Sequence, residues 1–496
     1  MITRSSEPGV NGLTHEQLLA VANPHRLLYI EAAPGSGKTT VSTQRFGLHR
    51  FARTTDHRAV VAVSFTRSAT EEIRSRVLQH WGPSTLAWPH RIATLDTVLY
   101  DLLTHLLQTG LLQWPGNHQE LEVLDTWRTH LPTTSTRRKP VLALEGTRVI
   151  TGSVREAKPG SQVSADDFAT AVGQGRCTHD NVREVLQLAL HVESVSASVI
   201  SFFSTTIRSL IVDEIYDAND LDLEIIRLAA DAGLNVTVVG DPWQALYGFR
   251  GARPDDVPRL ISRQGFERSK LRTSFRWCDS AQESLALQLR RKERTVLPTG
   301  SARDVNVVLA RQWKMLWDTD PHVLPLAIKP RVGQFQEAAC TLLLNELVQS
   351  TFGQHAIFLN DAQTTLGIKD GSALAELRPL LKTTLERLAG QHDLGGIWNN
   401  MADALLTKTP TNPSGKHERT PLTGLKNLRT RLHVARERLV PGLTCHQAKG
   451  RQWDKVGVRL EETDAAALRH GLDPGNEDHR SLYVALTRAR HLSLAV

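Results

Sequence analysis

Short apolar segments that end in polar or glycine-bearing loops recur along the first half of the chain. Residues 59–65 are an almost continuous apolar run, and residues 207–212 and 236–239 are rich in Val, Ile and Leu. This is the pattern of strands buried on both faces of a parallel sheet. A polar, charged segment with helical character follows at 66–80, so a β–α–β unit is expected. The pattern predicts an α/β protein built on parallel sheets.

This alternation of strand and helix patterns is interrupted twice. Residues 106–200 show helical patterns at 119–129 and 181–191 around a loop rich in Thr, Gly, Ser and basic residues. Residues 352–441 also have a helical pattern. The first interruption is nearly neutral, with nine Lys or Arg against ten Asp or Glu. Residues 408–438 are basic, with eight such residues against two acidic ones. A solvated helix face and a nucleic-acid track are both open interpretations of that excess.

A second α/β unit is predicted to begin near Leu271. Strands are expected at 305–309, 322–327 and 492–496, with a helix at 334–348. A chain of 496 residues is too long for one hydrophobic core, so several domains are expected. The predicted parts are a first α/β domain at 1–105 and 201–270, a mainly helical insertion at 106–200, a second α/β domain at 271–351 and 442–496, and a mainly helical, partly basic insertion at 352–441.

One glycine-bearing loop stands between an apolar run and a predicted helix. This phosphate loop consists of Ala33, Pro34, Gly35, Ser36, Gly37, Lys38, Thr39 and Thr40. It follows the pattern G-x-x-x-x-G-K-[ST], with Ala32 at the first position. Backbone N–H groups can face nucleotide phosphates, the lysine can reach the outer phosphates and the first threonine can hold Mg²⁺ at a helix N-terminus. The loop predicts binding of a nucleoside triphosphate.

Composition narrows the cellular setting. Lys and Arg exceed Asp and Glu by 59 to 52, which gives a net charge of +7 and weakly favours a polyanionic partner. The four cysteines contain no C-x-x-C pair, so reduced structural thiols are expected rather than a zinc or iron–sulfur site. The N-terminus lacks a signal-peptide layout, and no apolar stretch reaches the length of a membrane span. We therefore expect a cytoplasmic protein without a membrane partner.

Two carboxylates directly follow the strand pattern at 207–212. Of Asp213 and Glu214, one can hold Mg²⁺ through water, while the other can orient or deprotonate an attacking water. A surface acidic turn is the structural alternative. We favour the catalytic interpretation because the pair ends a hydrophobic strand downstream of the phosphate loop.

Residues 240–252 place a glutamine and an aromatic, basic stretch just after the next strand pattern. Gln244 lies where it can sense phosphate. Tyr247, Phe249 and Arg250 suit single-stranded nucleic acid, because aromatic faces stack on any base and arginine pairs with backbone phosphate. A buried aromatic corner is the alternative interpretation of the same residues.

Eight blocks, in this order, resemble those of UvrD/Rep-type superfamily 1 DNA helicases. They are Gln17, 35–39, 65–72, 213–214, 240–252, 271–276, 444–450 and 483–490. The resemblance spans residues 13–496, with the two insertions recognisable by position alone. It implies two RecA-like P-loop motor domains with ATP and Mg²⁺ bound between them, each interrupted by an accessory domain.

The resemblance also implies roles for the matched side chains. The implied catalytic residues are Lys38 for the phosphates, Glu214 for the attacking water, Gln244 for coupling the γ-phosphate to DNA, and Arg276 and Arg488 for the γ-phosphate charge. The implied binding residues are Gln17 and Phe275 at adenine, residues 33–40 at the phosphates, and Thr39 and Asp213 at Mg²⁺. The implied DNA-facing residues are Phe65, Thr66, Tyr247, Phe249, Arg250, Thr444 and His446. Arginines from a second domain make hydrolysis depend on closure of the cleft.

Some positions depart from the family pattern. Tyr216 stands where the Asp-Glu-x-Gln-Asp block has its glutamine, and Phe275 replaces a tyrosine. Residues 94–96 read Thr-Leu-Asp rather than a Thr-Phe-His-like block, and Gln452 replaces a glutamate. These changes affect the expected grip on DNA and the recognition of the ribose, not the hydrolysis machinery.

The resemblance implies an ATP-dependent helicase that moves 3′-to-5′ on single-stranded DNA and opens tailed duplexes. A different class remains open, namely a DNA-stimulated ATPase that senses nucleic acid and regulates a separate nuclease while unwinding little. By length and layout the chain also resembles the helicase subunits of antiphage systems such as Gabija, which act beside a nuclease protein. DNA repair and antiviral defence are both open as pathways. A metabolic P-loop kinase does not account for residues 247–250 or for the two late arginines.

Overall fold

The computed structural model describes residues 12–329, 332, 334–368, 371–409, 420–435 and 437–496. The chain divides into two compact units, Met1–Phe275 and Arg276–Val496. The main sheet of each unit consists entirely of parallel strands, so the predicted α/β fold is confirmed. Part of the predicted basic stretch, residues 410–419 and 436, lies outside the described residues.

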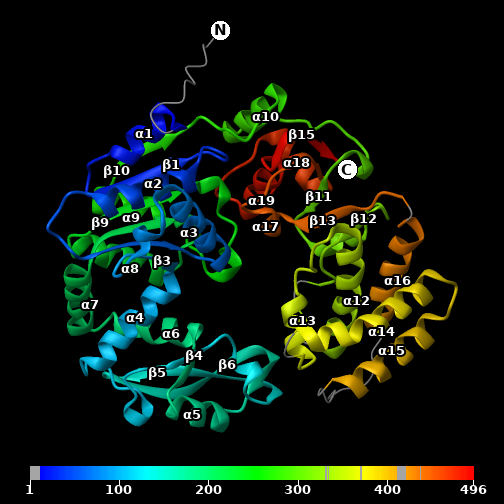
Figure 1. The fold of residues 1–496 in the computed structure, drawn as a ribbon, viewed down its shortest axis with the longest axis horizontal. Coiled ribbons are helices and arrows are strands. Elements are labelled where there is room, and N and C mark those ends of the chain that lie inside the picture. The colour runs from blue at the N-terminus through cyan, green and yellow to red at the C-terminus, as the bar shows by residue number, and fades with distance from the viewer. Residues whose placement is uncertain (1–11, 330–331, 333, 369–370, 410–419, 436) are drawn as a thin grey trace. The chain divides into compact units, whose positions relative to one another are not determined.

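Six strands form the main sheet of the first unit, in the order β10-β1-β9-β8-β2-β3 (Figure 1). They are β1 (Leu27–Ala32), β2 (Ala59–Ser64), β3 (Arg91–Thr94), β8 (Ile207–Asp213), β9 (Asn235–Gly240) and β10 (Glu267–Leu271). The four central strands are almost wholly buried and match the apolar runs of the sequence. The edge strands were not predicted by the sequence pattern, because β3 has only four residues and β10 is mostly polar and charged.

Helices cover both faces of this sheet. Alternate residues of a strand face opposite ways, so Leu28 and Ile30 pack with α1 and α2 whereas Leu27 and Tyr29 join a core on the other face. The helices of the first face are α1 (His15–Ala22), α2 (Lys38–Phe51) and α3 (Arg67–Trp81). The core of the second face includes residues of α4 (Leu95–Gln108), α6 (His179–Ala189), α7 (Glu193–Thr206), α8 (Asp220–Asp231) and α9 (Val257–Gln264).

The region at 106–200 is not mainly helical, which corrects the sequence prediction. Its largest element is an antiparallel hairpin of β5 (Thr133–Glu145) and β6 (Arg148–Val163). Instead of the helix expected at 119–129, the chain forms β4 (Glu122–Leu124) and a 3₁₀ turn, and β4 pairs in parallel with β7 (Arg176–Thr178). The alternating strand pattern around a Glu-Gly-Thr-Arg turn was a hairpin signal, but the flanking Thr and basic residues suggested a loop.

The helix expected at 181–191 is present as α6, and α5 (Ala165–Gly173) also belongs to this region. Taken alone, no helix among the described residues is long and apolar enough to cross a membrane. Only α6 and α7 together reach that length and composition, and they are bent by 115° at their junction. Both helices contribute side chains to the core shared with the main sheet.

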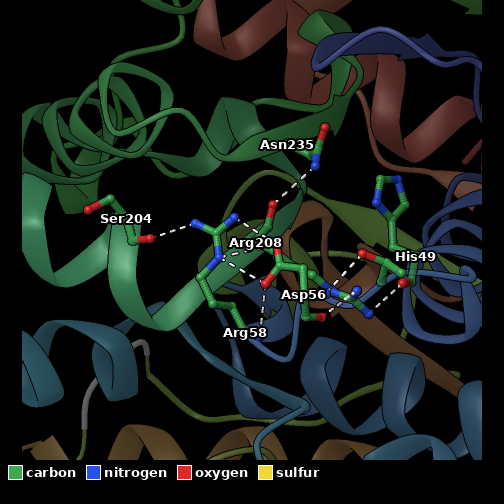
Figure 2. A network of polar contacts seen from close by, with 7 residues as sticks. His49, Asp56, Arg58, Ser204, Arg208 and Asn235 are labelled. Atoms are coloured by element: carbon green, nitrogen blue, oxygen red, sulfur yellow. Dashed lines mark hydrogen bonds and ion pairs between the residues drawn. The ribbon is translucent and has the colours of Figure 1, made fainter.

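The edge at which the strands begin is held by a network of arginines (Figure 2). Arg208 of β8 donates to the carbonyl oxygen of His49 in the last turn of α2 (2.8 Å) and to that of Asp56 (2.9 Å). Arg58 pairs with the Asp56 carboxylate at 2.7 Å and donates to the carbonyl of Ser204 in α7. Cations at helix C-termini offset the partial negative charge of the last carbonyls. The network therefore anchors α2 at the end opposite to the phosphate loop.

The second unit contains five parallel strands in the order β12-β13-β11-β14-β15. They are β11 (Val307–Ala310), β12 (Val323–Pro325), β13 (Val440–Thr444), β14 (Trp453–Val458) and β15 (Ala489–Ala495). The helices of this α/β part are α10 (Ser280–Arg290), α11 (Trp313–Trp317), α17 (Cys445–Ala448), α18 (Glu462–His470) and α19 (Glu477–Leu486). Strands β11, β12 and β15 fall where the sequence pattern predicted strands.

Between β12 and β13 the described chain is helical, as predicted. These helices are α12 (Phe335–Phe352), α13 (Leu359–Thr365), α14 (Gly371–Ala389), α15 (Leu394–Lys408) and α16 (Thr420–Val434). Most of α12 is buried, because α13, α14 and α16 pack around it. The helix predicted at 334–348 corresponds to α12.

Candidate active site

The chemistry-bearing segments of the first unit follow the carboxyl ends of its strands. β1 leads into the phosphate loop, β8 ends at Asp213, and β9 leads into residues 241–252. Since all strands of the sheet are parallel, these ends lie at one edge, where α/β proteins bind ligands. β9 pairs with both β1 and β8, so the three segments are neighbours along that edge.

The phosphate loop has the backbone geometry of an anion-binding site. Gly35 and Gly37 have φ values of 75° and 84°, in the left-handed region that favours glycine. A Cβ atom on Gly37 would lie 2.5 Å from Nε2 of Gln17. α2 starts at Lys38 with no side chain of the described residues capping it, so its first N–H groups and the positive end of its dipole face the loop. This arrangement suits phosphate.

Two carboxylates and a lysine meet beside the loop. Lys38 Nζ lies 3.6 Å from Glu214 Oε1, and the Ser42 hydroxyl donates to Asp213 Oδ1 at 3.4 Å. Burial, and then the neighbouring Glu214 carboxylate, raise the pKa of Asp213 to about 7. Glu214 has a φ of 61° and a ψ of 45°, a backbone conformation that costs a non-glycine residue roughly 1–3 kcal/mol. Such strain is concentrated at functional sites.

The donor set beside the loop suits Mg²⁺. This cation takes one or two carboxylates and completes its shell with hydroxyl, water and phosphate oxygens. Asp213 supplies a buried carboxylate beside the loop, and Thr39 supplies a hydroxyl in the first turn of α2. No group of three or more His, Cys, Asp or Glu suited to a metal occurs among the described residues. A cation here would therefore need phosphate and water oxygens as further ligands.

The predicted adenine residue Gln17 is anchored to the phosphate loop. Its side chain forms a capping box with Thr14 at the start of α1, and its Nε2 donates to the carbonyl oxygen of Ser36 at 2.9 Å. The residue is only 5% exposed. The position of α1 therefore determines the position of this amide.

Phe275 lies beside the same loop. Its backbone N–H donates to the carbonyl oxygen of Gly35 at 3.0 Å, while its side chain is 55% exposed. The Glu16 carboxylate accepts from the N–H groups of Arg272 (2.7 Å) and Thr273 (3.1 Å), which ties this segment to α1. The backbone is held at the loop while the ring remains accessible for stacking.

Arg45 connects α2 to α1 behind the loop. Its guanidinium donates from Nη1 to the carbonyl oxygens of Ala20 and Val21, both at 3.0 Å, and from Nε to Thr237 Oγ1 at 2.9 Å. Burial lowers the pKa of Arg45 to about 10, so the side chain is still charged at neutral pH. A cation thus caps the last turn of α1, the helix that carries Gln17.

The segment after β9 combines a buried amide with an exposed aromatic face. Gln244 Nε2 donates to Asp241 Oδ2 at 2.7 Å, and both residues are buried. Phe249 is 65% exposed, and its ring centroid lies 6.0 Å from that of Tyr247. The Arg250 guanidinium lies 5.3 Å and 5.6 Å from the centroids of the two rings. This exposure favours base stacking over the alternative of a buried aromatic corner.

Two threonines predicted to face DNA occupy matching places in the two units. Thr66 ends the link from β2 to α3 and Thr444 ends β13, and each caps the following helix through its hydroxyl. Phe65 packs partly against the core, and His446 is half-buried in the short helix α17. Each unit thus presents a capped helix start after a parallel strand.

Two departures from the family pattern have structural explanations. The Tyr216 hydroxyl lies 2.9 Å from that of Tyr29 in β1, and burial raises the pKa of Tyr216 to about 12. Asp96 pairs at 2.7 Å with Arg183 of α6, which also contacts Asp222 of α8 at 2.8 Å. Both positions therefore serve contacts inside the first unit.

The two arginines predicted for the γ-phosphate lie together in the second unit. Arg276 Nη1 donates to the carbonyl oxygen of Thr487 at 2.8 Å, one residue before Arg488. Arg488 is 1% exposed, and its Nε donates to the carbonyl of Val484 at 3.0 Å. Residues separated by more than 200 positions in the sequence are thereby brought to the same end of α19.

The sequence analysis missed several residues that build the site. Ser42 contacts Asp213, Glu16 holds the segment before Phe275, and Asp241 holds Gln244. Asp241 lies within the matched block 240–252, three residues before Gln244, so its contact with Gln244 could have been predicted from the sequence. Ser42 and Glu16 act through tertiary contacts that no local spacing announces.

The comparisons with known proteins agree with this geometry. The family model described as UvrD/REP helicase N-terminal domain matches residues 13–137 and 166–263. The unmatched stretch between these segments contains most of the β5–β6 hairpin. The match therefore covers the phosphate loop, the carboxylate pair and the aromatic segment of the first unit.

Individual helicases are similar to this chain at low sequence identity. The putative ATP-dependent DNA helicase YjcD of Bacillus subtilis is 24% identical over 283 residues, covering 50% of this chain and 34% of the relative. DNA helicase II of Escherichia coli is 25% identical over 285 residues, covering 54% and 39%. ATP-dependent DNA helicase UvrD2 of Mycobacterium bovis is 22% identical over 585 aligned residues, covering 99% and 79%. The aligned region spans little more than a third of the length of the first two relatives. Together, the family model and these relatives place the chain in the family of UvrD/Rep-type helicases.

Proposed function

We propose that this chain is an ATP-driven translocase that moves on single-stranded DNA and unwinds tailed duplexes with 3′-to-5′ polarity. One observation carries the proposal. The phosphate loop, the Asp213-Glu214 pair and the exposed face of Tyr247, Phe249 and Arg250 follow adjacent parallel strands at one sheet edge. Gln244 lies in the short segment between the end of β9 and the aromatic residues Tyr247 and Phe249. A change in the contact of Gln244 with the γ-phosphate would therefore reach the DNA-binding residues through only a few residues of chain.

The two parallel sheets support a division of the chain into two motor domains and two accessory domains. We assign residues 1–105 and 201–270 to the first RecA-like motor domain, 271–351 and 442–496 to the second, and 106–200 and 352–441 to accessory domains. The first motor domain carries the phosphate loop and both carboxylates. The second supplies Arg276 and Arg488.

ATP hydrolysis is assigned to the residues around the phosphate loop. Lys38 holds the outer phosphates, and its 3.6 Å contact with Glu214 gives way when phosphate oxygens take its place. Glu214 is then available to orient the attacking water. Thr39 and Asp213 hold Mg²⁺, which neutralises charge on the phosphates when it is bound.

Transition-state charge and the base complete the nucleotide site. Arg276 and Arg488 stabilise negative charge that develops on the γ-phosphate. Gln17 and Phe275 contact the adenine, by hydrogen bonding and by stacking. The anchoring of Gln17 to Ser36 supports this role, because it links base recognition to the phosphate loop.

The DNA track combines stacking with backbone contacts. Phe249 and Tyr247 offer stacking faces, and Arg250 offers a cation to the backbone. The remaining contacts of the track are assigned to Phe65, Thr66, Thr444 and His446. The Thr66 and Thr444 hydroxyls each accept from a backbone N–H of the following helix, and we assign both threonines to contacts with the DNA backbone.

The deciding experiment measures the ATPase rate with and without single-stranded DNA, and unwinding of duplexes with a 3′ or a 5′ tail. We expect stimulation by single strands and unwinding from the 3′ tail. Lys38→Ala should lose both ATP binding and hydrolysis, whereas Glu214→Gln should lose hydrolysis and still bind ATP. Glu224→Gln, on the surface of α8, is the matched control and should behave as wild type.

Two results would redirect the proposal. Stimulated hydrolysis without unwinding from either tail would identify a DNA-sensing ATPase, of the kind that regulates a separate nuclease. Equal loss of ATP binding in Lys38→Ala and Glu214→Gln would overturn the roles given to these residues.

A further inference from the structure

The β5–β6 hairpin (Figure 1) carries a group of cations that neither the ATP site nor the aromatic face uses. Residues 133–163 contain six Lys or Arg and two Asp or Glu, whereas residues 106–200 as a whole contain nine and ten. The positive charge of this region is therefore concentrated in the hairpin. Five exposed side chains gather around the register shift of the two strands, and we call them the hairpin cation cluster: Arg137, Arg138, Lys139, Arg155 and Lys158.

The charge of this cluster is not balanced within the hairpin. Arg138 lies directly opposite Arg155 in the antiparallel register, and like charges at paired positions destabilise a sheet. At the turn of the same hairpin, Arg148 lies opposite Glu145, a pair of opposite charge. Among the residues that the structure describes, none forms an ion pair with a member of the cluster. The arrangement favours an external anion.

The cluster also falls outside what the family match accounts for. The matched segments end at residue 137 and resume at 166, so four of the five cations lie in the unmatched stretch. The backbone changes register between Thr136 and Arg138, and such irregularities redirect the side chains of a strand. The register shift that gathers the cations therefore lies at the border of a stretch that the family model does not match.

We propose that the hairpin cation cluster binds the phosphate backbone of a DNA duplex, which rests on the proposed work of the chain on DNA. Cations alone suffice for a duplex backbone, whose contacts position a protein without reading bases. Single-strand grooves add aromatic faces on which bases stack. Residues 133–163 contain no Phe, Tyr or Trp, in contrast to the segment that holds Tyr247 and Phe249. The hairpin is thus matched to the duplex and the aromatic face to the single strand.

The test compares Arg155→Gln and Arg138→Gln with Arg148→Gln in the full chain. All three remove an exposed arginine from the same hairpin, but only Arg148 lies opposite an acidic residue. Binding of a blunt duplex and of a single strand of equal length is measured without nucleotide across a salt series. Each cluster variant should flatten the duplex slope of log K against log salt by about 0.9, the loss of one phosphate contact. Single-strand binding should be unchanged, and Arg148→Gln should match wild type.

The outcomes separate this inference from the proposed function. Duplex binding by Arg155→Gln and Arg138→Gln that equals Arg148→Gln overturns the inference. An equal loss of single-strand and duplex affinity overturns the assignment to duplex. Absence of ATPase stimulation by single strands in wild type refutes the proposed function alone, because duplex binding is measured without ATP. Relief of the repulsion with Arg138 predicts that the melting temperature of Arg155→Gln does not fall, which checks that a loss of duplex binding is not caused by unfolding.

Discussion

Replacing Arg45 by alanine should loosen α1, and with it the amide of Gln17. The Arg45 side chain is 1% exposed and has two donors on Nη1 for the carbonyl oxygens of Ala20, Val21 and Asn23, besides Nε for Thr237. Three hydrogen bonds from a charged donor, at about 1.5 kcal/mol each because the carbonyls share donors, contribute about 4.5 kcal/mol. These contacts are what the substitution removes.

An opposing contribution comes from the buried charge. Burial lowers the pKa of Arg45 from 12.5 to about 10. Removing the charged group therefore returns about 3.5 kcal/mol, at about 1.4 kcal/mol for each pKa unit. The net loss is about 1 kcal/mol, which corresponds to an opening of α1 that is about fivefold more frequent.

Hydrogen exchange of the amides of α1 measures this opening directly, because local opening is reported by residue rather than for the whole chain. Arg259→Ala is the matched control, since Arg259 is an exposed arginine paired with Asp256, and such pairs are worth under about 1 kcal/mol. Titration with ATP and with tripolyphosphate supplies a second readout. ATP binding should weaken in Arg45→Ala, while tripolyphosphate binding should not, because it lacks the base that Gln17 is proposed to contact.

Wild-type exchange of the α1 amides in Arg45→Ala would refute the argument. Equal weakening of ATP and tripolyphosphate would show that Arg45 acts on the phosphate loop rather than through α1. Arg45→Lys retains the charge but places it on a single nitrogen, so it should restore only part of the protection.

Other substitutions test the remaining assignments. Arg276→Ala and Arg488→Ala should each lower ATP turnover about a thousandfold or more without abolishing ATP binding, since transition-state arginines act on developing charge; near-normal turnover in both would show hydrolysis by the first unit alone. Phe249→Ala should cost about 1–3 kcal/mol of single-strand affinity and leave the salt slope unchanged. Arg250→Ala should instead flatten that slope by about one phosphate contact, and circular dichroism confirms folding of both variants.

The central strands of the first sheet could be predicted because burial on both faces makes them continuously apolar, whereas β13 and β14, which are central in the second sheet, were not predicted. The run at 59–65 became β2, and the run at 236–239 lies within β9. The phosphate loop and Asp213-Glu214 were also readable, since the residues that build them are adjacent in sequence. In such cases local pattern and tertiary environment agree.

The rest depended on contacts between distant residues. Edge strand β10 is Glu-Arg-Ser-Lys-Leu, and only its pairing with β1 makes it a strand. Arg45 occupies an ordinary helical position, and its importance arises from carbonyl groups of another helix. The β5–β6 hairpin was missed because its charged, exposed residues outweighed an alternating pattern.

The β5–β6 hairpin and the Asp213-Glu214 pair belong to one packed structure. The hairpin is joined to α6 by the backbone N–H of Leu142, which donates to the Glu184 carboxylate at 3.3 Å. The adjacent Arg183 contacts Asp222 in the first turn of α8, a helix that begins six residues after Glu214. Residues of α4, α6 and α8 also share a single hydrophobic core with the main sheet. Because close-packed cores transmit strain, these contacts join the hairpin mechanically to the segment that carries Glu214, whose backbone lies in the left-handed region.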